Sequence, residues 1–380
     1  MRIALISASR VPSRTANSIE LMKVCQAFVD LGHDIHLWLP GSEQKIVWAE
    51  LKEIYGIRDS FPISRVTSLR VFRRYDFSLR AVLKARAWDP SLCYVWPLQA
   101  AAIASSLGLP TALEIHDCPQ GRLGPILFRR FLEGRGAIRA LPITEAMREW
   151  LSDAYQVDLE PPFALVAPMG MDLAQYHNLP DPEKAREKLG LNEGFTAGYA
   201  GHLYAGRGID MLMDLAWRNQ DVHFLWAGGE PEAVEFWRSR LQKAGLQNVK
   251  LLGFVPNERL PLVQAACDVL LMPYERKISG SSGGDTAQFA SPMKQFEYLA
   301  SGRVIIASDL PVFREVLNEE NAVLLPPNDV AAWDEALNQL IADDSRRNSL
   351  AERARKDAAQ YDWRDRARRL LGGLEENDAA

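Results

Sequence analysis

The chain has 380 residues, of which 47% are hydrophobic and 24% charged, and its formal net charge is −5. This composition is typical of a soluble globular protein, the length favours two domains, and the acidic balance argues against a nucleic-acid partner. No run of 18 apolar residues occurs, so no membrane-spanning helix is expected. Four scattered cysteines without metal-ligand spacing predict reduced thiols in a cytoplasmic protein.

The first half of the chain alternates short apolar stretches with amphipathic ones. Strands are predicted at 3–6, 35–39, 92–95, 111–115, 140–143 and 164–167, and a helix at 18–31. The first of these strands is too short to be the apolar part of a signal peptide. The alternation predicts a parallel sheet with helices on both faces.

A polar stretch at 176–182 contains two prolines and predicts a linker. Strands are predicted after it at 196–199, 223–226, 249–251, 269–272, 304–307 and 322–325, with helices at 209–217, 232–244, 257–266, 331–342 and 363–374. The sequence therefore predicts an α/β protein with two domains, 1–175 and 183–362. Ligands in such sheets gather at the carboxyl ends of strands, which favours a cleft between the two domains.

The segment 291–302 places Lys294 and Glu297 three residues apart at the start of an apolar helix, so that they share one face. Unpaired N–H groups at a helix start suit a phosphate, which Lys294 would neutralise, while Glu297 would accept a hydrogen bond from a sugar hydroxyl. The alternative is an ordinary ion pair on a surface helix.

Residues 198–208 form a glycine-rich turn between a predicted strand and a predicted helix, where Arg207 would bind a phosphate. The alternative is a tight connection without a ligand. The glycine spacing differs from G-x-G-x-x-G, and the first strand-to-helix turn lacks glycine, so a nicotinamide enzyme is not expected. Two further turns, at 226–230 and 252–256, would frame a nucleotide base through backbone groups.

Two segments of the first half carry candidate site residues. His116 lies beside Asp117 at the end of a strand, where it would donate a hydrogen bond or handle a proton, and the alternative is a cap on the following turn. The residues at the start of the first helix would offer backbone N–H groups to a phosphate or an acceptor; they are Thr15, Ala16, Asn17 and Ser18. An ordinary N-cap at Asn17 or Ser18 explains the same residues.

Basic and aromatic residues form two clusters in the first half. The first holds Arg65, Arg70, Arg73, Arg74, Arg80, Lys84 and Arg86 with Phe72, Tyr75, Phe77 and Trp88, and the second holds Arg122, Arg129, Arg130, Arg135 and Arg139 with Phe128 and Phe131. Such a face fits an anionic lipid or an anionic acceptor, and hence a peripheral contact at the inner face of the membrane. The alternative is a solvated surface.

Taken in order along the chain, these segments resemble the motifs of the retaining glycosyltransferase family 4. The matching segments are 21–31, 32–35, 114–117, 143–146, 167–172, 201–208, 254–256, 268–273 and 291–302. The resemblance implies a GT-B fold, in which two Rossmann-like parallel-sheet domains face each other across a cleft and the last helix, here within 363–380, rejoins the first domain.

The resemblance also implies roles for individual residues. It makes His116, Arg207 and Lys294 catalytic; the residues implied to bind the donor are Gly201, His202, Arg207, Gly229, Phe254, Val255, Asp285, Ser291, Pro292, Met293, Lys294 and Glu297. Two positions depart from the family. His202 stands where an arginine is usual, and Phe289 stands where the first glutamate of an E-x7-E pair is usual, with Asp285 as a substitute for it.

The implied reaction moves a sugar from a nucleotide diphosphate sugar to an acceptor hydroxyl with retention, in cell-envelope glycan or polysaccharide biosynthesis. The implied partners are the nucleotide-sugar donor and a glycan, lipid-linked or small-molecule acceptor. No acidic D-x-D cluster stands ready for a metal, and no cofactor or metal is expected. Two alternatives remain: a nucleotide-sugar epimerase or hydrolase of the same fold, and a catalytically silent nucleotide-sugar binding protein.

Overall fold

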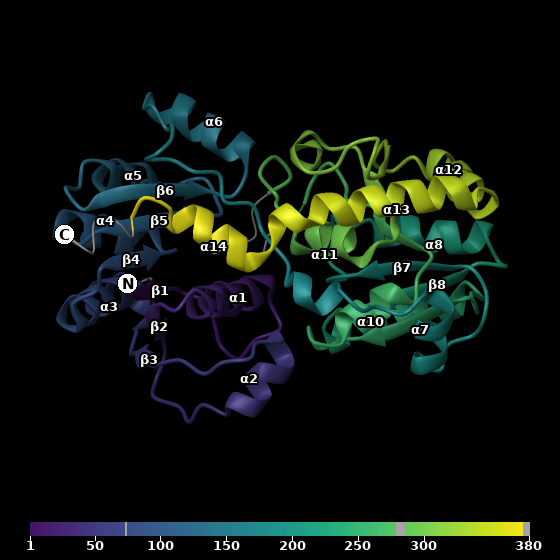
Figure 1. Ribbon diagram of the computed structural model, residues 1–380, viewed down its shortest axis with the longest axis horizontal. Helices are drawn as coiled ribbons and strands as arrows, with labels where there is room; N and C mark the ends of the chain where they lie inside the picture. The colour runs from purple at the N-terminus through teal and green to yellow at the C-terminus, as the bar shows by residue number, and fades with distance from the viewer. Residues whose placement is uncertain (73, 279–285, 375–380) are drawn as a thin grey trace. The chain divides into compact units, whose positions relative to one another are not determined.

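The computed structural model describes residues 1–72, 74–278 and 286–374 (Figure 1). It divides into two compact units: unit 1 comprises Met1–Met169 and the segment from Trp363 onward, and unit 2 comprises Gly170–Asp362. The stretch 176–182, expected to be a linker, lies inside unit 2. Hydrogen bonds hold the start of this unit to its end, because the Met171 amide donates to the Tyr361 carbonyl over 3.1 Å and the Leu173 amide to Asp362 over 3.0 Å.

Unit 1 is built on a six-stranded parallel sheet in the order β3-β2-β1-β4-β5-β6. The strands are β1 (Arg2–Ile6), β2 (Asp34–Pro40), β3 (Ile63–Val66), β4 (Leu92–Val95), β5 (Thr111–Ile115) and β6 (Ala137–Pro142). The chain reverses its direction of travel across the sheet between β1 and β4. At such a switch point the loops after two neighbouring strands diverge and leave space for a ligand.

The helices of unit 1 are α1 (Ala16–Asp30), α2 (Trp48–Tyr55), α3 (Tyr75–Trp88), α4 (Leu98–Ser106), α5 (Gly124–Leu132), α6 (Glu145–Tyr155) and α14 (Trp363–Leu371). Helix α4 packs between α3 and α5, and α14 packs against α1 (Figure 1). The last helix of the chain therefore belongs to the unit formed by the first half of the sequence.

Unit 2 repeats this topology with a parallel sheet in the order β12-β11-β10-β7-β8-β9. Its strands are β7 (Thr196–Ala200), β8 (His223–Ala227), β9 (Val249–Gly253), β10 (Val269–Met272), β11 (Val304–Ser308) and β12 (Val323–Leu325), and its helices are α7 (Pro182–Leu189), α8 (Ile209–Arg218), α9 (Pro231–Lys243), α10 (Leu260–Ala265), α11 (Met293–Ser301), α12 (Val330–Ala342) and α13 (Asp344–Ala358). The switch point lies between β7 and β10. The loops after these two strands lead to α8 and α11.

The structure confirms the α/β class and the two parallel sheets, and it corrects one predicted strand. Residues 164–167 run beside β6 and form only an isolated bridge, between Ala140 and Ala164. Leu165 and Ala167 still donate to Ala140 and Pro142, but Pro142 has no N–H group to donate back, so a regular ladder of hydrogen bonds cannot continue there. The sequence analysis also missed β3, a partly polar edge strand, and α13, which buries only Leu350, Ala354 and Ala358.

Candidate functional site

Most of the candidate residues of unit 2 follow the carboxyl ends of its strands. Gly201, His202 and Arg207 lie in the loop between β7 and α8, and Lys294 and Glu297 lie on α11, which follows β10. The fold therefore brings the two most informative segments of the sequence to the switch point of one sheet. We call the group formed by Lys294, Arg207, His202, Gly201, Tyr199, Tyr274 and Glu297 the Lys294 site.

Lys294 is the central charge of this site. Its side chain is almost fully buried, and its Nζ has no hydrogen-bond partner among the described residues. The ammonium lies 3.8 Å from the ring centre of Tyr199 and 5.1 Å from that of Tyr274, so aromatic faces contact it where a counter-ion would be expected. Burial, followed by repulsion from Arg207, lowers the pKa of Lys294 well below its usual value, while Glu297 acts in the opposite direction.

Arg207 places a second positive charge beside Lys294. Its guanidinium lies 4.6 Å from the ring centre of Tyr274 and is half-buried. Burial, and then the charges of Arg207 and Lys294, lower the pKa of His202 to about 4, so this imidazole is neutral near pH 7. His202, which stands where the family usually has an arginine, therefore supplies no cation here, because a neutral imidazole cannot replace a guanidinium.

Glycines make room for the Lys294 ammonium. A Cβ added to Gly201 would lie 2.5 Å from Lys294 Nζ, and the φ of 154° at this residue is unfavourable for other residue types. A Cβ at the neighbouring Gly228 would lie 2.2 Å from the Gly201 carbonyl oxygen. Glycine is therefore required here by the close approach of two loops and a lysine.

Glu297 lies near Lys294 and is 9% exposed. Its carboxylate accepts a long hydrogen bond of 3.5 Å from Gln264 Nε2, and it faces the phenols of Tyr176 and Tyr274 closely enough to affect their pKa values. Lys294 and Glu297 thus share a buried environment, which contradicts the interpretation as an exposed surface pair.

The start of α11 adds backbone donors. Pro292 is the N-cap residue and provides no side-chain cap, so the first N–H groups of the helix, beginning at Met293, lack that partner. Ser291 precedes it. The other predicted residues of unit 2 lie at strand ends: Gly229 follows β8 and packs against Leu203, and Phe254 and Val255 follow β9. Asp285 lies outside the described residues.

The candidate residue of unit 1, His116, follows β5 in a buried polar cluster. Its Nε2 lies 2.9 Å from Glu114 Oε1 and 3.4 Å from Glu20 Oε1, and its ring centre lies 4.6 Å from that of Trp96. Arg366 on α14 donates to the same Glu114 oxygen over 2.8 Å, and Tyr94 donates to Glu114 Oε2. We call Glu20, Tyr94, Glu114, His116 and Arg366 the His116 cluster.

Protonation in the His116 cluster follows from burial and charge. Burial raises the pKa of Glu20 to about 8. Burial would also raise the pKa of Glu114, but Arg366 and the hydrogen bond from His116 outweigh it and lower the value to about 2. Burial opposes the imidazolium, yet the two carboxyl groups raise the pKa of His116 to about 9. Near neutral pH the negative charge therefore resides on Glu114, and His116 is a cation.

One oxygen from each of Glu20 and Glu114 and one nitrogen of His116 lie within 4.8 Å of one another, a spacing that could also accommodate a metal ion. The Arg366 guanidinium already occupies one side of Glu114 and neutralises it. With Glu20 protonated, Arg366 offsets Glu114 and the imidazolium of His116 leaves the cluster with one positive charge.

The predicted N–H groups at the first helix are only partly available. Helix α1 begins at Ala16 with Thr15 as the N-cap, earlier than a cap at Asn17 or Ser18 would place it. The Ser18 hydroxyl is buried and donates to the carbonyls of Ser13 and Thr15. Ala16 and Asn17 are exposed.

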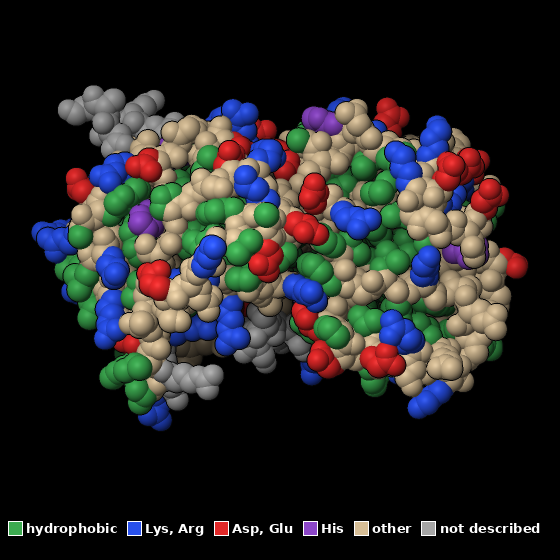
Figure 2. Space-filling model, turned by 90° about the horizontal axis from the view of Figure 1, so that it is seen from below, with side chains coloured by type: hydrophobic (Ala, Val, Ile, Leu, Met, Phe, Trp, Pro, Cys, Tyr) green, Lys and Arg blue, Asp and Glu red, His purple; other side chains and the backbone are tan. Residues whose placement is uncertain are grey.

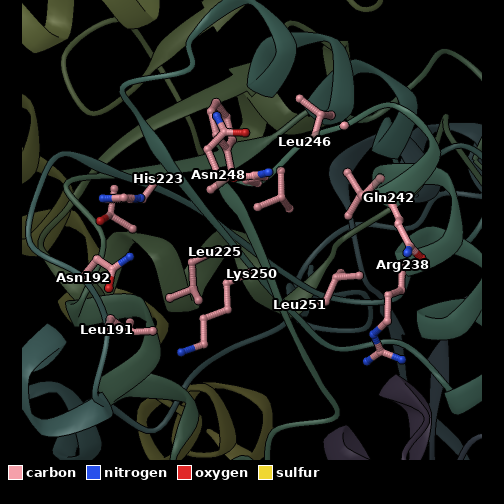
Figure 3. A pocket seen from close by; sticks show the side chains of 16 residues that line it. Leu191, Asn192, His223, Leu225, Arg238, Gln242, Leu246, Asn248, Lys250 and Leu251 are labelled. Carbon is pink, nitrogen blue, oxygen red and sulfur yellow. The ribbon is translucent and has the colours of Figure 1, made fainter.

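A cavity of about 650 Å³ lies elsewhere in unit 2 (Figure 3). Thr196, His223 and Val249, the first residues of β7, β8 and β9, line it together with Lys250 and Arg238. It therefore lies at the amino ends of the strands, away from the Lys294 site, and contains none of the predicted residues.

The sequence analysis missed several partners of the predicted residues. In the sequence, Tyr199 and Tyr274 are simply aromatic residues near the ends of predicted strands. Their contact with Lys294 becomes visible only in the folded structure. Glu20 is one of several buried polar residues of α1, and its sequence position does not show that it lies beside His116. Arg366 was indistinguishable from the other arginines of its helix.

The fold is that of the GT-B glycosyltransferases. Sucrose-phosphate synthase from Thermosynechococcus elongatus matches over 100% of this chain and 99% of its own, with a TM-score of 0.76 and 16% identity. HepE from Anabaena in complex with UDP-glucose matches over 100% of both chains, with a TM-score of 0.73 and 20% identity. These likenesses show the fold alone.

Residues 194–343 match the family described as "Glycosyl transferases group 1". The chain therefore carries a domain of the group 1 glycosyl transferases. The chain is 28% identical over 303 residues to a D-inositol 3-phosphate glycosyltransferase from Xylanimonas cellulosilytica. The aligned region covers 76% of this chain and 67% of that relative. Other relatives of that description are matched over about half of their length, 45% and 51% in two cases.

Proposed function

We propose that this chain is a retaining glycosyltransferase that moves a sugar from a nucleotide diphosphate sugar to an acceptor hydroxyl. The buried ammonium of Lys294 beside Arg207, which finds no hydrogen-bond partner within residues 1–72, 74–278 and 286–374, carries the proposal. Burying an unpaired charge is costly, and a diphosphate would supply the missing counter-charge. The two cations and the start of α11 are the features expected around such a group.

The proposed chemistry is electrostatic. As the glycosidic bond breaks, the leaving diphosphate gains negative charge and the sugar becomes oxocarbenium-like. Lys294, Arg207 and the N–H groups at the start of α11 would stabilise that charge. Glu297, on the same helix, would accept a hydrogen bond from the ribose. The proposal requires no metal ion, because protein cations provide the compensating charge.

The donor and acceptor are proposed from the similar proteins. The structure of HepE contains UDP-glucose, and the relative from Xylanimonas cellulosilytica is described as acting on D-inositol 3-phosphate. We therefore propose a nucleotide diphosphate donor, with UDP-glucose as the first probe, and a hydroxyl acceptor in cell-envelope glycan or polysaccharide assembly. An anionic acceptor also fits the cationic His116.

The test measures thermal stabilisation and turnover of the purified protein with UDP-, GDP- and ADP-sugars, in EDTA. We expect one nucleotide to stabilise the protein in proportion to ln(1 + [L]/Kd) and the matching sugar to be transferred with its anomeric configuration kept. Stabilisation without transfer or hydrolysis, across an acceptor panel, would favour the silent binding protein, which the neutral His202 and the uncharged Phe289 support. Activity only after adding Mg²⁺ would contradict the metal-free mechanism.

Glu297→Ala is expected to weaken UDP binding by about 1–3 kcal/mol, the contribution of one hydrogen bond to a charged group. Isothermal calorimetry measures it, and Glu352→Ala on α13 is the matched control because Glu352 is exposed. If the unaltered protein, Glu297→Ala and Glu352→Ala bind UDP with equal affinity, Glu297 does not bind the ribose.

We also propose that unit 1 contacts anionic membranes through the outer surface of α3 and α5. Leu79 and Leu83 on α3 and Ile126 on α5 are 47%, 49% and 61% exposed, and exposed Arg80 and Arg130 lie on the same helices. In Figure 2, blue Lys and Arg side chains lie among green hydrophobic ones over the visible part of unit 1, with red Asp and Glu side chains interspersed. No helix in the described ranges combines the length and hydropathy needed to span a bilayer.

For this surface we expect flotation with vesicles that contain phosphatidylglycerol and none with neutral vesicles, and we expect salt to weaken the binding. Leu83→Glu should reduce flotation several-fold, because it removes apolar area and adds a repelled charge. Trp217→Glu on α8, at a side chain that is 66% exposed, is the control. An equal loss in both variants would contradict a specific surface.

A further inference from the structure

Glu114 contacts every other residue of the His116 cluster. A carboxylate offers about four acceptor positions, and Glu114 receives Tyr94, His116 and Arg366 with both of its oxygens buried. The Glu20 carboxyl forms a further hydrogen bond with it. A group whose acceptor capacity is filled in this way cannot rotate without losing several contacts, so it fixes the position of whatever it binds.

Arg366 in turn fixes Glu114. The guanidinium is 2% exposed and donates to the carbonyls of Pro168 over 2.7 Å and Ala167 over 3.1 Å as well as to Glu114. Its planar fork reaches these three acceptors from two separate nitrogens, Nε and Nη2, whereas a lysine has a single nitrogen to donate from. The C-terminal helix thereby connects to the residue that holds His116.

We propose that Glu114, locked by Arg366, is a positioning residue that turns Nε2 of His116 inward and presents Nδ1–H as a hydrogen-bond donor to a ligand oxygen. This rests on the proposed function, in which that oxygen belongs to the donor sugar or the acceptor. The ring of Trp96 packs against the imidazole and restricts its rotation further.

The charges around His116 support a donor role. Glu20 on α1, Glu114 on β5 and Arg366 on α14 face it, and Asp117 follows it in the chain. With a pKa raised to about 9, the imidazolium keeps its proton near neutral pH and does not act as a base there. The folded pKa lies above the ordinary value of 6.5, so the pairing stabilises the fold fully below pH 6.5 and is lost as pH rises through 9.

The first experiment follows the His116 ring signals by NMR as pH changes, with His116→Gln used to assign them. In the unaltered protein we expect a titration midpoint well above 6.5, and a midpoint at or below 6.5 would overturn the proposal without any variant having to fold. In Glu114→Gln we expect the midpoint to fall by about 1–3 units, because one adjacent negative charge is removed. An unchanged midpoint would overturn it.

Tyr94→Phe is the matched control, since it removes one hydrogen bond to Glu114 and keeps the carboxylate. The His116 midpoint should fall less in Tyr94→Phe than in Glu114→Gln. An equal fall in both variants would mean that any disturbance of the cluster lowers the midpoint, and it would contradict a specific role of the Glu114 carboxylate.

A second experiment measures turnover. With UDP-glucose as donor, Glu114→Gln should lower kcat by about 10- to 100-fold with little change in KM, the kinetic equivalent of one lost hydrogen bond from a charged group. Altered midpoints in a protein that transfers no sugar would leave the positioning role intact and reject the proposed function, whereas transfer with an unaltered midpoint in Glu114→Gln would reject the positioning role alone.

Discussion

Lys294→Met is expected to separate binding from stability. UDP affinity should fall by about 10- to 100-fold, because the variant loses a charge-assisted hydrogen bond to phosphate. The ligand-free protein should be as stable as before or more stable by about 1–2 kcal/mol, since the variant no longer buries an ammonium that has no hydrogen-bond partner among the described residues, but it also loses the contact with Tyr199. Calorimetry with UDP and thermal melting measure the two effects.

Lys250→Met is the control for this substitution, because Lys250 is exposed and lies on β9. It should change neither quantity. A large loss of stability in Lys294→Met would instead show that the ammonium supports the fold and would contradict its assignment to a phosphate.

The depressed pKa of Lys294 predicts a pH dependence with a definite sign. Between the folded pKa and the ordinary value of 10.5, the unfolded chain binds more protons than the folded one, so stability rises with pH across that interval. A bound diphosphate favours the protonated form, so UDP binding takes up a proton there and weakens as pH rises. Calorimetry in buffers of different ionisation enthalpy detects the proton, and Lys294→Met should show none.

Arg366→Met is expected to have the largest effect on stability. It removes one of the two cations that pair with the buried Glu114 carboxylate and leaves His116 as the other, and breaking a buried ion pair costs about 3–5 kcal/mol in comparable sites. Hydrogen exchange in unit 1 is the suitable measurement, because a chain with two units need not unfold in one step. Protection should fall in β5 and α14 and stay unchanged in unit 2.

Arg368→Met, on the same helix, is the matched control. The side chain of Arg368 is 57% exposed and pairs with Asp365, so its loss should cost no more than about 1 kcal/mol. The double substitution Glu114→Met with Arg366→Met should recover most of the loss, because both charges are then removed. Equal effects of the two single variants would contradict a buried pair.

The predictability of the fold followed the hydrophobic pattern. Buried strands such as β4 and β10 were predicted with their observed ends, because a parallel strand covered on both faces is a continuous apolar run. The pattern failed where burial is slight: α13 buries one side of a polar sequence, and β3 is an edge strand. The remaining error is the strand predicted at 164–167. Because Pro142 in β6 has no N–H group, these residues run beside β6 without forming a regular ladder.

The position of the candidate site residues in the fold was predictable from the sequence, but the residues that contact them were not. Lys294, Arg207 and His116 follow strands, and the carboxyl ends of parallel strands meet at one edge of a sheet. Their partners come from distant parts of the chain: Tyr274 contacts Arg207, and Arg366 reaches Glu114. Such contacts depend on how helices pack, which local sequence does not encode.

The return of α14 to unit 1 also bears on how the chain folds during synthesis. Unit 2 is continuous in sequence, whereas unit 1 lacks Arg366 until residues 363–371 have left the ribosome. Domains usually complete their folding in the order in which they emerge. Here the order is expected to be reversed, with unit 1 held as an incomplete intermediate, its Glu114 carboxylate lacking the Arg366 guanidinium, until helix α14 arrives.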